Sequence, residues 1–148
     1  MFLPLTVLSN NALQKNWKNN GLMMAETYLL TAGITNLTKE LVQRKRPFLY
    51  NPGVPLSEKL KADATSSFFS GHTSMTAASC FLTASMWSNK LKGNEQAAIW
   101  TSAAVIPAFV GFLRWKGGKH YWTDIITGYA VGAAIGILIP KIQPEIQP

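Results

Sequence analysis

Two stretches of the chain, 97–113 and 125–139, contain no charged side chain. Each is slightly shorter than the roughly 20 apolar residues of a typical membrane-spanning helix. The second stretch carries Gly128, Gly132 and Gly136 at four-residue spacing, which is the small-residue pattern that lets membrane helices approach closely. We therefore expect two helices that cross a membrane. The alternative is a pair of buried helices in a soluble bundle.

Proline positions predict where the helices end. Pro47 closes the first helix, because the residue before a proline is pushed out of the α region. Pro107 falls inside the third helix, and Pro140 should stop the fourth. Residues 9–20 predict a polar loop or a short surface helix, and 47–68 predict a long loop. The approximate bounds expected for the four helices are 22–45, 70–89, 95–113 and 121–139.

No alternating strand pattern is present, so the expected fold class is an all-α, antiparallel helical bundle that spans a membrane. Residues 1–148 form a single domain, in which the segment 1–21 precedes core helices at 22–140 and a tail follows at 141–148. Because neighbouring helices run antiparallel, the end of the first helix, the start of the second, the end of the third and the start of the fourth should share one side.

The net charge is +7, from 14 lysine and arginine residues against 7 aspartate and glutamate residues. A basic chain suits nucleic acid, an anionic membrane or a phosphate ligand. The basic residues cluster at 39–46, 59–61 and 114–119, and they form no long tract interleaved with aromatic residues. Nucleic acid is therefore disfavoured as a partner.

Two short motifs place donors for an anion near helix ends. Lys39 and Arg46 are seven residues apart, nearly two helical turns, which predicts both cations on one helix stripe. Two cations so placed would repel each other, and an anion bound between them would explain the arrangement. Ser70, Gly71 and His72 begin the second helix, where unsatisfied amides and the helix dipole favour a phosphate. The alternatives are a solvated basic helix end and a plain serine cap.

The third motif contains Arg114, His120 and Asp124. An aspartate four residues after a histidine lies on the same helix face, so its carboxylate can hold the far imidazole nitrogen. The other nitrogen is then free to act as a base or nucleophile. The arginine fork fits phosphate oxygens. A surface His–Asp pair beside an unrelated basic loop is the alternative, and the shared side of the bundle argues against it.

The three motifs together resemble the signature of the type 2 phosphatidic acid phosphatases, which share a core with the vanadium haloperoxidases. The resemblance covers roughly 22–140 and includes Pro47 after the first arginine. It implies an all-α bundle and hydrolysis of a phosphate ester through a phosphohistidine, with no metal and no other cofactor.

By that resemblance His120 would be the nucleophile and Asp124 its orienting group. His72 would protonate the leaving oxygen and later activate water. The resemblance assigns the phosphate oxygens to Lys39, Arg46, Ser70, Gly71 and Arg114. The chain departs from the family pattern at Phe69, where proline is usual, and at Leu113, where serine is frequent. Family members in membranes typically carry about six helices, so the chain either lacks one or two leading helices or is a reduced form.

Three other functions are compatible with parts of the pattern. One is a vanadate-dependent haloperoxidase on the same anion seat. Another is a membrane protein that binds phospholipids without turnover. The third is a metal site built from His72, His120 and Asp124, which the lack of close ligand spacing and the neighbouring cations disfavour.

The expected substrate is a phosphorylated lipid, and phosphatidate, phosphatidylglycerophosphate, an isoprenyl diphosphate and a phosphorylated lipid A all remain open. The orientation of a membrane protein is usually predicted from the basic residues in its loops. Here the basic residues of the candidate site make that prediction ambiguous. The family resemblance favours an integral protein of a bacterial inner membrane, with the site facing the periplasm.

Overall fold

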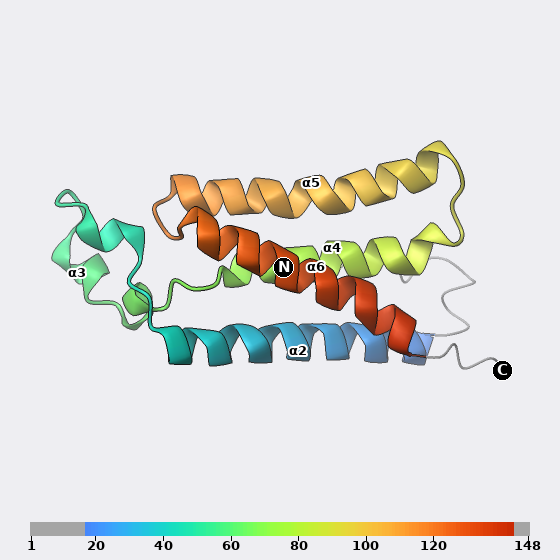
Figure 1. The fold of residues 1–148 in the computed structure, drawn as a ribbon, viewed down its shortest axis with the longest axis horizontal. Helices are drawn as coiled ribbons and strands as arrows, with labels where there is room; N and C mark the ends of the chain where they lie inside the picture. The colour runs from blue at the N-terminus through green and yellow to red at the C-terminus, as the bar shows by residue number, and fades with distance from the viewer. Residues whose placement is uncertain (1–16, 144–148) are drawn as a thin grey trace.

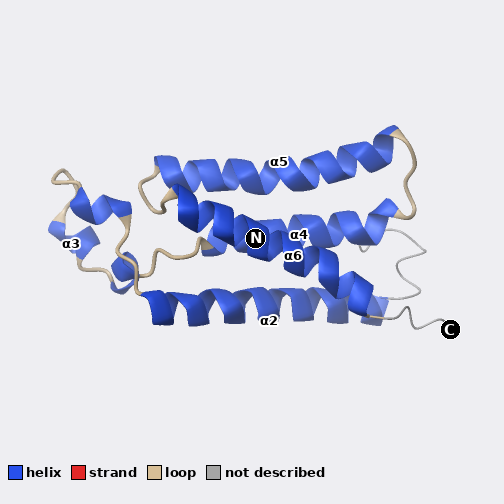
Figure 2. Cartoon of the chain, viewed as in Figure 1, coloured by secondary structure: helices blue, strands red, loops and turns tan. Residues whose placement is uncertain are grey.

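The computed structural model describes residues 17–143 of the chain. Four long helices run side by side in that part (Figure 1): α2 (Trp17–Val42), α4 (Gly71–Ser88), α5 (Asn94–Lys116) and α6 (Trp122–Ile142). Within the described residues no strand is present (Figure 2), so the expected all-α fold is confirmed.

Helix α4 lies at the centre of the bundle and packs against α2, α5 and α6. Its tightest contact is with α6, along the predicted glycine seam. A Cβ atom at Gly128 would lie 2.7 Å from the Ser70 carbonyl oxygen, and one at Gly132 would lie 2.1 Å from that of Ser74. Gly136 meets the Ala78 carbonyl oxygen at 2.5 Å in the same way. The three glycines therefore let the two backbones touch, as the spacing predicted.

Helix α2 has its polar side inward and its apolar side outward. Thr27 and Thr31 have no exposed surface, and the Thr31 hydroxyl donates to the Thr27 carbonyl at 2.6 Å. The exposed large side chains of this helix are mostly leucines: Leu22, Leu29, Leu30, Leu37 and Leu41. A helix in water shows the opposite pattern.

Helices α5 and α6 are long and apolar enough to cross a membrane, and most of each apolar segment lies outside the core of the bundle. The core helix of a soluble protein would be mostly buried. This finding favours the membrane interpretation of the two charge-free stretches over a pair of buried soluble helices.

Several expected helix bounds were wrong. Helix α2 begins at Trp17, so 17–20 belong to it, while 1–16 lie outside the described residues. It ends at Val42 because Gln43 adopts a left-handed conformation with φ 45° and donates its amide to the Lys39 carbonyl, a common helix stop. Helix α6 continues through Pro140 to Ile142, since a proline in the last turn removes only one hydrogen bond.

The expected long loop at 47–68 consists largely of short helical turns: η2 (Pro47–Tyr50), α3 (Leu56–Lys59) and η3 (Ala62–Thr65). They lie beyond one end of the bundle, where α2 and α5 end and α4 and α6 begin (Figure 1). The predicted shared side is therefore present, and the short turns extend it.

Alanine at Gly132 should destabilise the protein, because the new methyl group would collide with the α4 backbone. We expect a loss of about 1–3 kcal/mol, measured as a lower melting temperature in detergent. Gly33→Ala is the matched control, because a Cβ there meets nothing within 4 Å and alanine is the better helix former. Equal effects of the two substitutions would contradict the close approach of α4 and α6.

Candidate functional site

The end of the bundle shared by the four long helices collects the predicted site residues from distant parts of the chain. Burial lowers the pKa of His72, and the nearby charges of Arg114, Lys39 and Arg46 lower it further. These residues come from the end of α2, the segment after it, the end of α5 and the start of α4, and His120 lies two residues before α6. The three motifs therefore form one cluster.

His120 is held by a partner that the sequence analysis missed. The residue is 1% exposed, and its Nδ1 lies 2.8 Å from the Ser67 carbonyl oxygen. Because a carbonyl only accepts, Nδ1 must carry the proton, which leaves Nε2 as the unprotonated nitrogen of the neutral ring. The expected direct bond to Asp124 is absent, since Oδ2 of Asp124 lies 3.7 Å from Nδ1. His120 precedes α6, so the two residues do not share a helix face.

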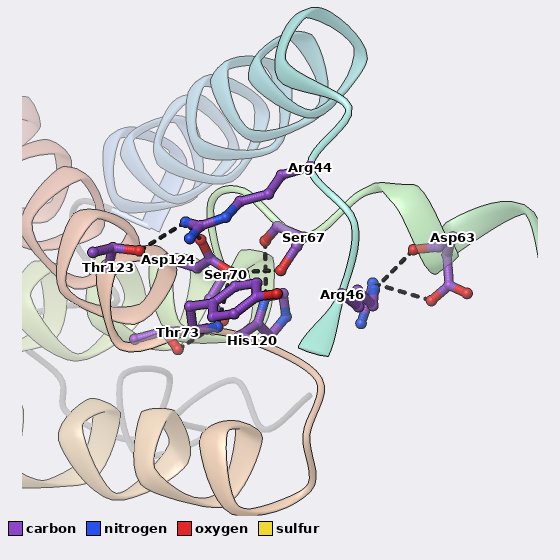
Figure 3. A network of polar contacts seen from close by, with 10 residues as sticks. Arg44, Arg46, Asp63, Ser67, Ser70, Thr73, His120, Thr123 and Asp124 are labelled. Atoms are coloured by element: carbon purple, nitrogen blue, oxygen red, sulfur yellow. Dashed lines mark hydrogen bonds and ion pairs between the residues drawn. The ribbon is translucent and has the colours of Figure 1, made fainter. Parts of the chain in front are cut away.

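The Asp124 carboxylate is fully buried and accepts three hydrogen bonds (Figure 3). Ser67 Oγ donates to Oδ2 at 2.5 Å, and the Tyr121 amide donates to the same oxygen at 2.9 Å. Arg44 Nη1 donates to Oδ1 at 2.7 Å. Asp124 therefore reaches His120 mainly through Ser67, which binds the carboxylate with its hydroxyl and the imidazole with its carbonyl.

Arg44 is the second residue that the sequence analysis missed. Its Nη1 also donates to Thr123 Oγ1 at 2.7 Å, and its guanidinium lies 4.1 Å from the centre of the Tyr121 ring. Arg44 thus ties the segment after α2 to the first turn of α6. In the sequence it is one of three adjacent basic residues, and no local pattern distinguishes its role from that of Lys45. Ser67 follows another serine, and no local pattern indicates which of the two binds the carboxylate.

Lys39 projects from the last turn of α2 onto the first residue of α4. A Cβ atom at Gly71 would lie 3.3 Å from Lys39 Nζ and 3.2 Å from a methyl group of Thr35. The absence of a side chain at Gly71 therefore gives the ammonium group its place beside the amides at the helix start. That combination of a cation and unsatisfied amides suits an anion.

Arg46 does not share a helix stripe with Lys39, contrary to the expectation. It lies after the end of α2 in an extended conformation, with φ −75° and ψ 151°. Its amide donates to the Ala64 carbonyl at 2.9 Å, and its guanidinium contacts Asp63. Arg46 is 5% exposed. The tertiary fold, and not helix periodicity, therefore sets where Arg46 lies relative to Lys39.

Arg114 and Ser70 complete the cluster in different ways. The Nε atom of Arg114 is buried and has no hydrogen-bond partner within residues 17–143, so one donor of its fork is unused. Ser70 is the predicted cap of α4: its Oγ accepts from the Thr73 amide at 3.4 Å and lies 2.9 Å from the Thr73 hydroxyl. Its own amide donates to the Asp124 carbonyl at 2.9 Å, which fixes the start of α4 to that of α6.

The pKa of His120 is lowered from its usual value, chiefly because burial disfavours the charged ring. Asp124 and the Ser67 carbonyl oppose this shift, while the charges of Arg46 and Arg114 add to it. The imidazole is therefore neutral at neutral pH, and its Nε2 lone pair is available for attack or for proton uptake.

The arrangement combines a neutral imidazole, a second histidine, three cations and the amides of a helix start. Such a cluster binds a tetrahedral oxyanion and can present a nucleophile to it. Within residues 17–143, no group of three or more His, Cys, Asp or Glu side chains is placed to hold a metal ion.

Comparison with known proteins gives one match. The model of the PAP2 superfamily matches residues 20–148, which is nearly the whole chain. Comparison with curated proteins and with solved structures finds no match. The family match covers all three motifs that the structure brings together.

His120 should titrate below pH 6.5, the usual histidine pKa. Between the lowered pKa and about 6.5 the unfolded chain binds more protons than the folded one. The stability that His120 contributes is therefore full above that window and falls as the pH drops through it. Histidine NMR titration of His72→Gln, which leaves a single histidine, measures the midpoint. A midpoint at or above 6.5 would contradict the assigned environment.

Arg44→Met should destabilise the protein, because the buried Oδ1 of Asp124 loses its donor. We expect a loss of about 1–3 kcal/mol in thermal or denaturant unfolding. Lys45→Met makes the same charge change at the adjacent exposed position and should leave stability nearly unchanged. Arg44→Lys should recover part of the loss. If the two methionine variants have the same free energy of unfolding, the Arg44–Asp124 ion pair does not stabilise the fold.

Proposed function

Because the chain belongs to the PAP2 superfamily, whose members are generally phosphatases, we propose that it is an integral membrane phosphatase. It hydrolyses a lipid phosphate or diphosphate without a metal, through a phosphohistidine formed on His120. The observation that carries the proposal is a buried His120 with an unprotonated Nε2, close enough to Arg46 and Arg114 for their charges to act on the ring, at the ends of two apolar helices.

The first step transfers the phosphoryl group to the enzyme. Lys39, Arg46 and Arg114 bind the phosphate oxygens, and the first amides of α4 add donors. Nε2 of His120 attacks phosphorus while the bond from phosphorus to the leaving oxygen breaks. Burial and the nearby cations lower the pKa of His72 in the free site; the negative charge of the bound phosphate opposes that shift, and the protonated ring gives its proton to the leaving oxygen. The new cationic ring keeps its Nδ1 proton on the Ser67 carbonyl, with the Asp124 carboxylate 3.7 Å away to stabilise the charge.

The second step returns the enzyme to its starting state. Neutral His72 takes a proton from water, and the water oxygen attacks phosphorus as the bond to Nε2 breaks. Inorganic phosphate leaves, His120 is neutral again and His72 is protonated. The three cations neutralise the developing charge in both steps, which is the main requirement of phosphoryl transfer.

Exposed aromatic side chains support a lipid substrate. Trp115 and Trp122 are 42% and 48% exposed, and their ring centres lie 4.9 Å apart. Each is within two residues of a site residue, Arg114 or His120. Tryptophan gathers at the level of lipid headgroups, so these two rings support a site at the depth of a lipid phosphate. The outward leucines of α2 support embedding of that helix as well.

Several lipid phosphates fit this proposal, including phosphatidate, phosphatidylglycerophosphate, an isoprenyl diphosphate and a phosphorylated lipid A. Location in a bacterial inner membrane, with the site toward the periplasm, is part of the same proposal and follows from the family resemblance.

Phosphate release from a panel of these lipids in detergent tests the function. The native chain should release phosphate in the presence of EDTA, and His120→Ala should lose activity by about a thousandfold or more, because no other group replaces the nucleophile. Rapid quenching in alkali, where a phosphoramidate survives, should trap the phosphoryl group on the native chain only.

Lys90→Ala is a suitable control, because Lys90 is exposed at the turn after α4, at the opposite end of the bundle. It should retain native activity and melt like the native protein. His120→Ala should melt at a lower temperature, because it removes a buried ring, and its helical circular dichroism at the assay temperature should show that it is still folded. Activity that survives in His120→Ala, or that EDTA abolishes, would overturn the mechanism. Lipid binding without turnover would instead indicate a binding protein.

A further inference from the structure

The acidic side chain of Asp63 contacts Arg46, one of the cations of the proposed phosphate site. The Nε atom of Arg46 donates to the main-chain oxygen of Asp63 at 2.8 Å, and Nη2 lies 3.0 Å from the Asp63 carboxylate (Figure 3). The Asp63 side chain is 61% exposed, whereas that of Arg46 is 6% exposed. The guanidinium is thus held in place from the solvent side by both a carbonyl and a carboxylate.

The charge of Asp63 reaches beyond Arg46. Its negative charge also favours the protonated forms of Lys39 and Arg114, while its contact at hydrogen-bond distance is with Arg46. Asp124 cannot serve them in the same way, since its carboxylate is buried and committed to Arg44, Ser67 and a main-chain amide. The Asp63 carboxylate therefore lowers the net positive charge that the three cations, and the protonated His72 of the proposed mechanism, present to an anion.

We propose that Asp63 determines specificity at this site by partly neutralising Arg46, so that a phosphate monoester is favoured over a more highly charged diphosphate. Repulsion from a fixed carboxylate grows with the charge of the ligand. The unfavourable electrostatic free energy of binding near Asp63 is therefore larger for a diphosphate than for a monophosphate. The inference rests on the proposed function, because it assigns the substrate class to the same anion site.

Asp63→Asn separates this charge effect from a role in positioning Arg46. The asparagine has the same shape, and its side-chain oxygen can still accept from Nη2. The bond from Nε to the main-chain oxygen is untouched, so the guanidinium should stay in place. Glu58→Gln is the matched control, because Glu58 lies in the same segment, pairs with Lys61 at 2.6 Å and contacts none of the site residues through that pair.

Calorimetric titration with inorganic phosphate and with pyrophosphate, in detergent, measures the effect without requiring turnover. Asp63→Asn should bind phosphate about two- to fivefold more tightly than the native chain, the range expected for a partly exposed ion pair. The gain for pyrophosphate should be larger. Asp63→Glu keeps the charge, and it should stay within about twofold of the native affinities, as should Glu58→Gln.

Weaker or unchanged phosphate binding by Asp63→Asn, or an equal gain for both anions, would overturn the role of Asp63 while leaving the proposed phosphatase intact. If the native chain binds neither anion, the anion site itself is absent, and the proposed function falls together with this inference. A larger gain for pyrophosphate in Asp63→Asn alone supports the assignment.

Discussion

The buried carboxylate of Asp124 is the constraint on which the site depends. An ionised carboxylate with no exposed surface needs donors, because leaving it unpaired would cost several kcal/mol. Its donors come from three separate segments: Arg44 after α2, Ser67 before α4, and the Tyr121 amide before α6. Satisfying one side chain therefore brings three parts of the chain together. The same Ser67 then fixes the proton on Nδ1 of His120, so the hydrogen bonds of Asp124 also determine which nitrogen of that ring is unprotonated.

The close packing of α4 and α6 makes this convergence possible. Gly128 lies directly against the Ser70 backbone, and the Ser70 amide donates to the Asp124 carbonyl. This hydrogen bond joins the starts of α4 and α6 close to both histidines, because Ser70 is two residues from His72 and Asp124 is four residues from His120. A larger side chain in the seam would separate these helix starts and move the two histidines apart. Stability of the bundle and geometry of the site thus rest on the same contact.

The outer surface completes the physical account. Apolar side chains face outward on α2, α5 and α6, while threonine and serine fill much of the interior. Lipid around the bundle would cover the outward apolar side chains. In the interior, the small hydroxylated side chains let the helices approach closely and form hydrogen bonds. The proposed anion site lies at the end of this apolar body, beside the exposed Trp115 and Trp122. This distribution supports a substrate that presents its phosphate at the membrane surface.

The sequence by itself determined the helices, their antiparallel order and the clustering of three motifs, because these follow from local patterns: charge-free stretches, glycine spacing and short connections. The tertiary structure decided what local patterns cannot express. Arg46 lies beyond Gln43, whose left-handed conformation follows the end of the helix that carries Lys39, and His120 binds a carbonyl 53 residues away instead of Asp124. Arg44, Ser67 and Asp63 acquire roles only from contacts across 80, 57 and 17 residues. Side-chain partners at such separations depend on how the helices pack, and no periodicity in the chain encodes them.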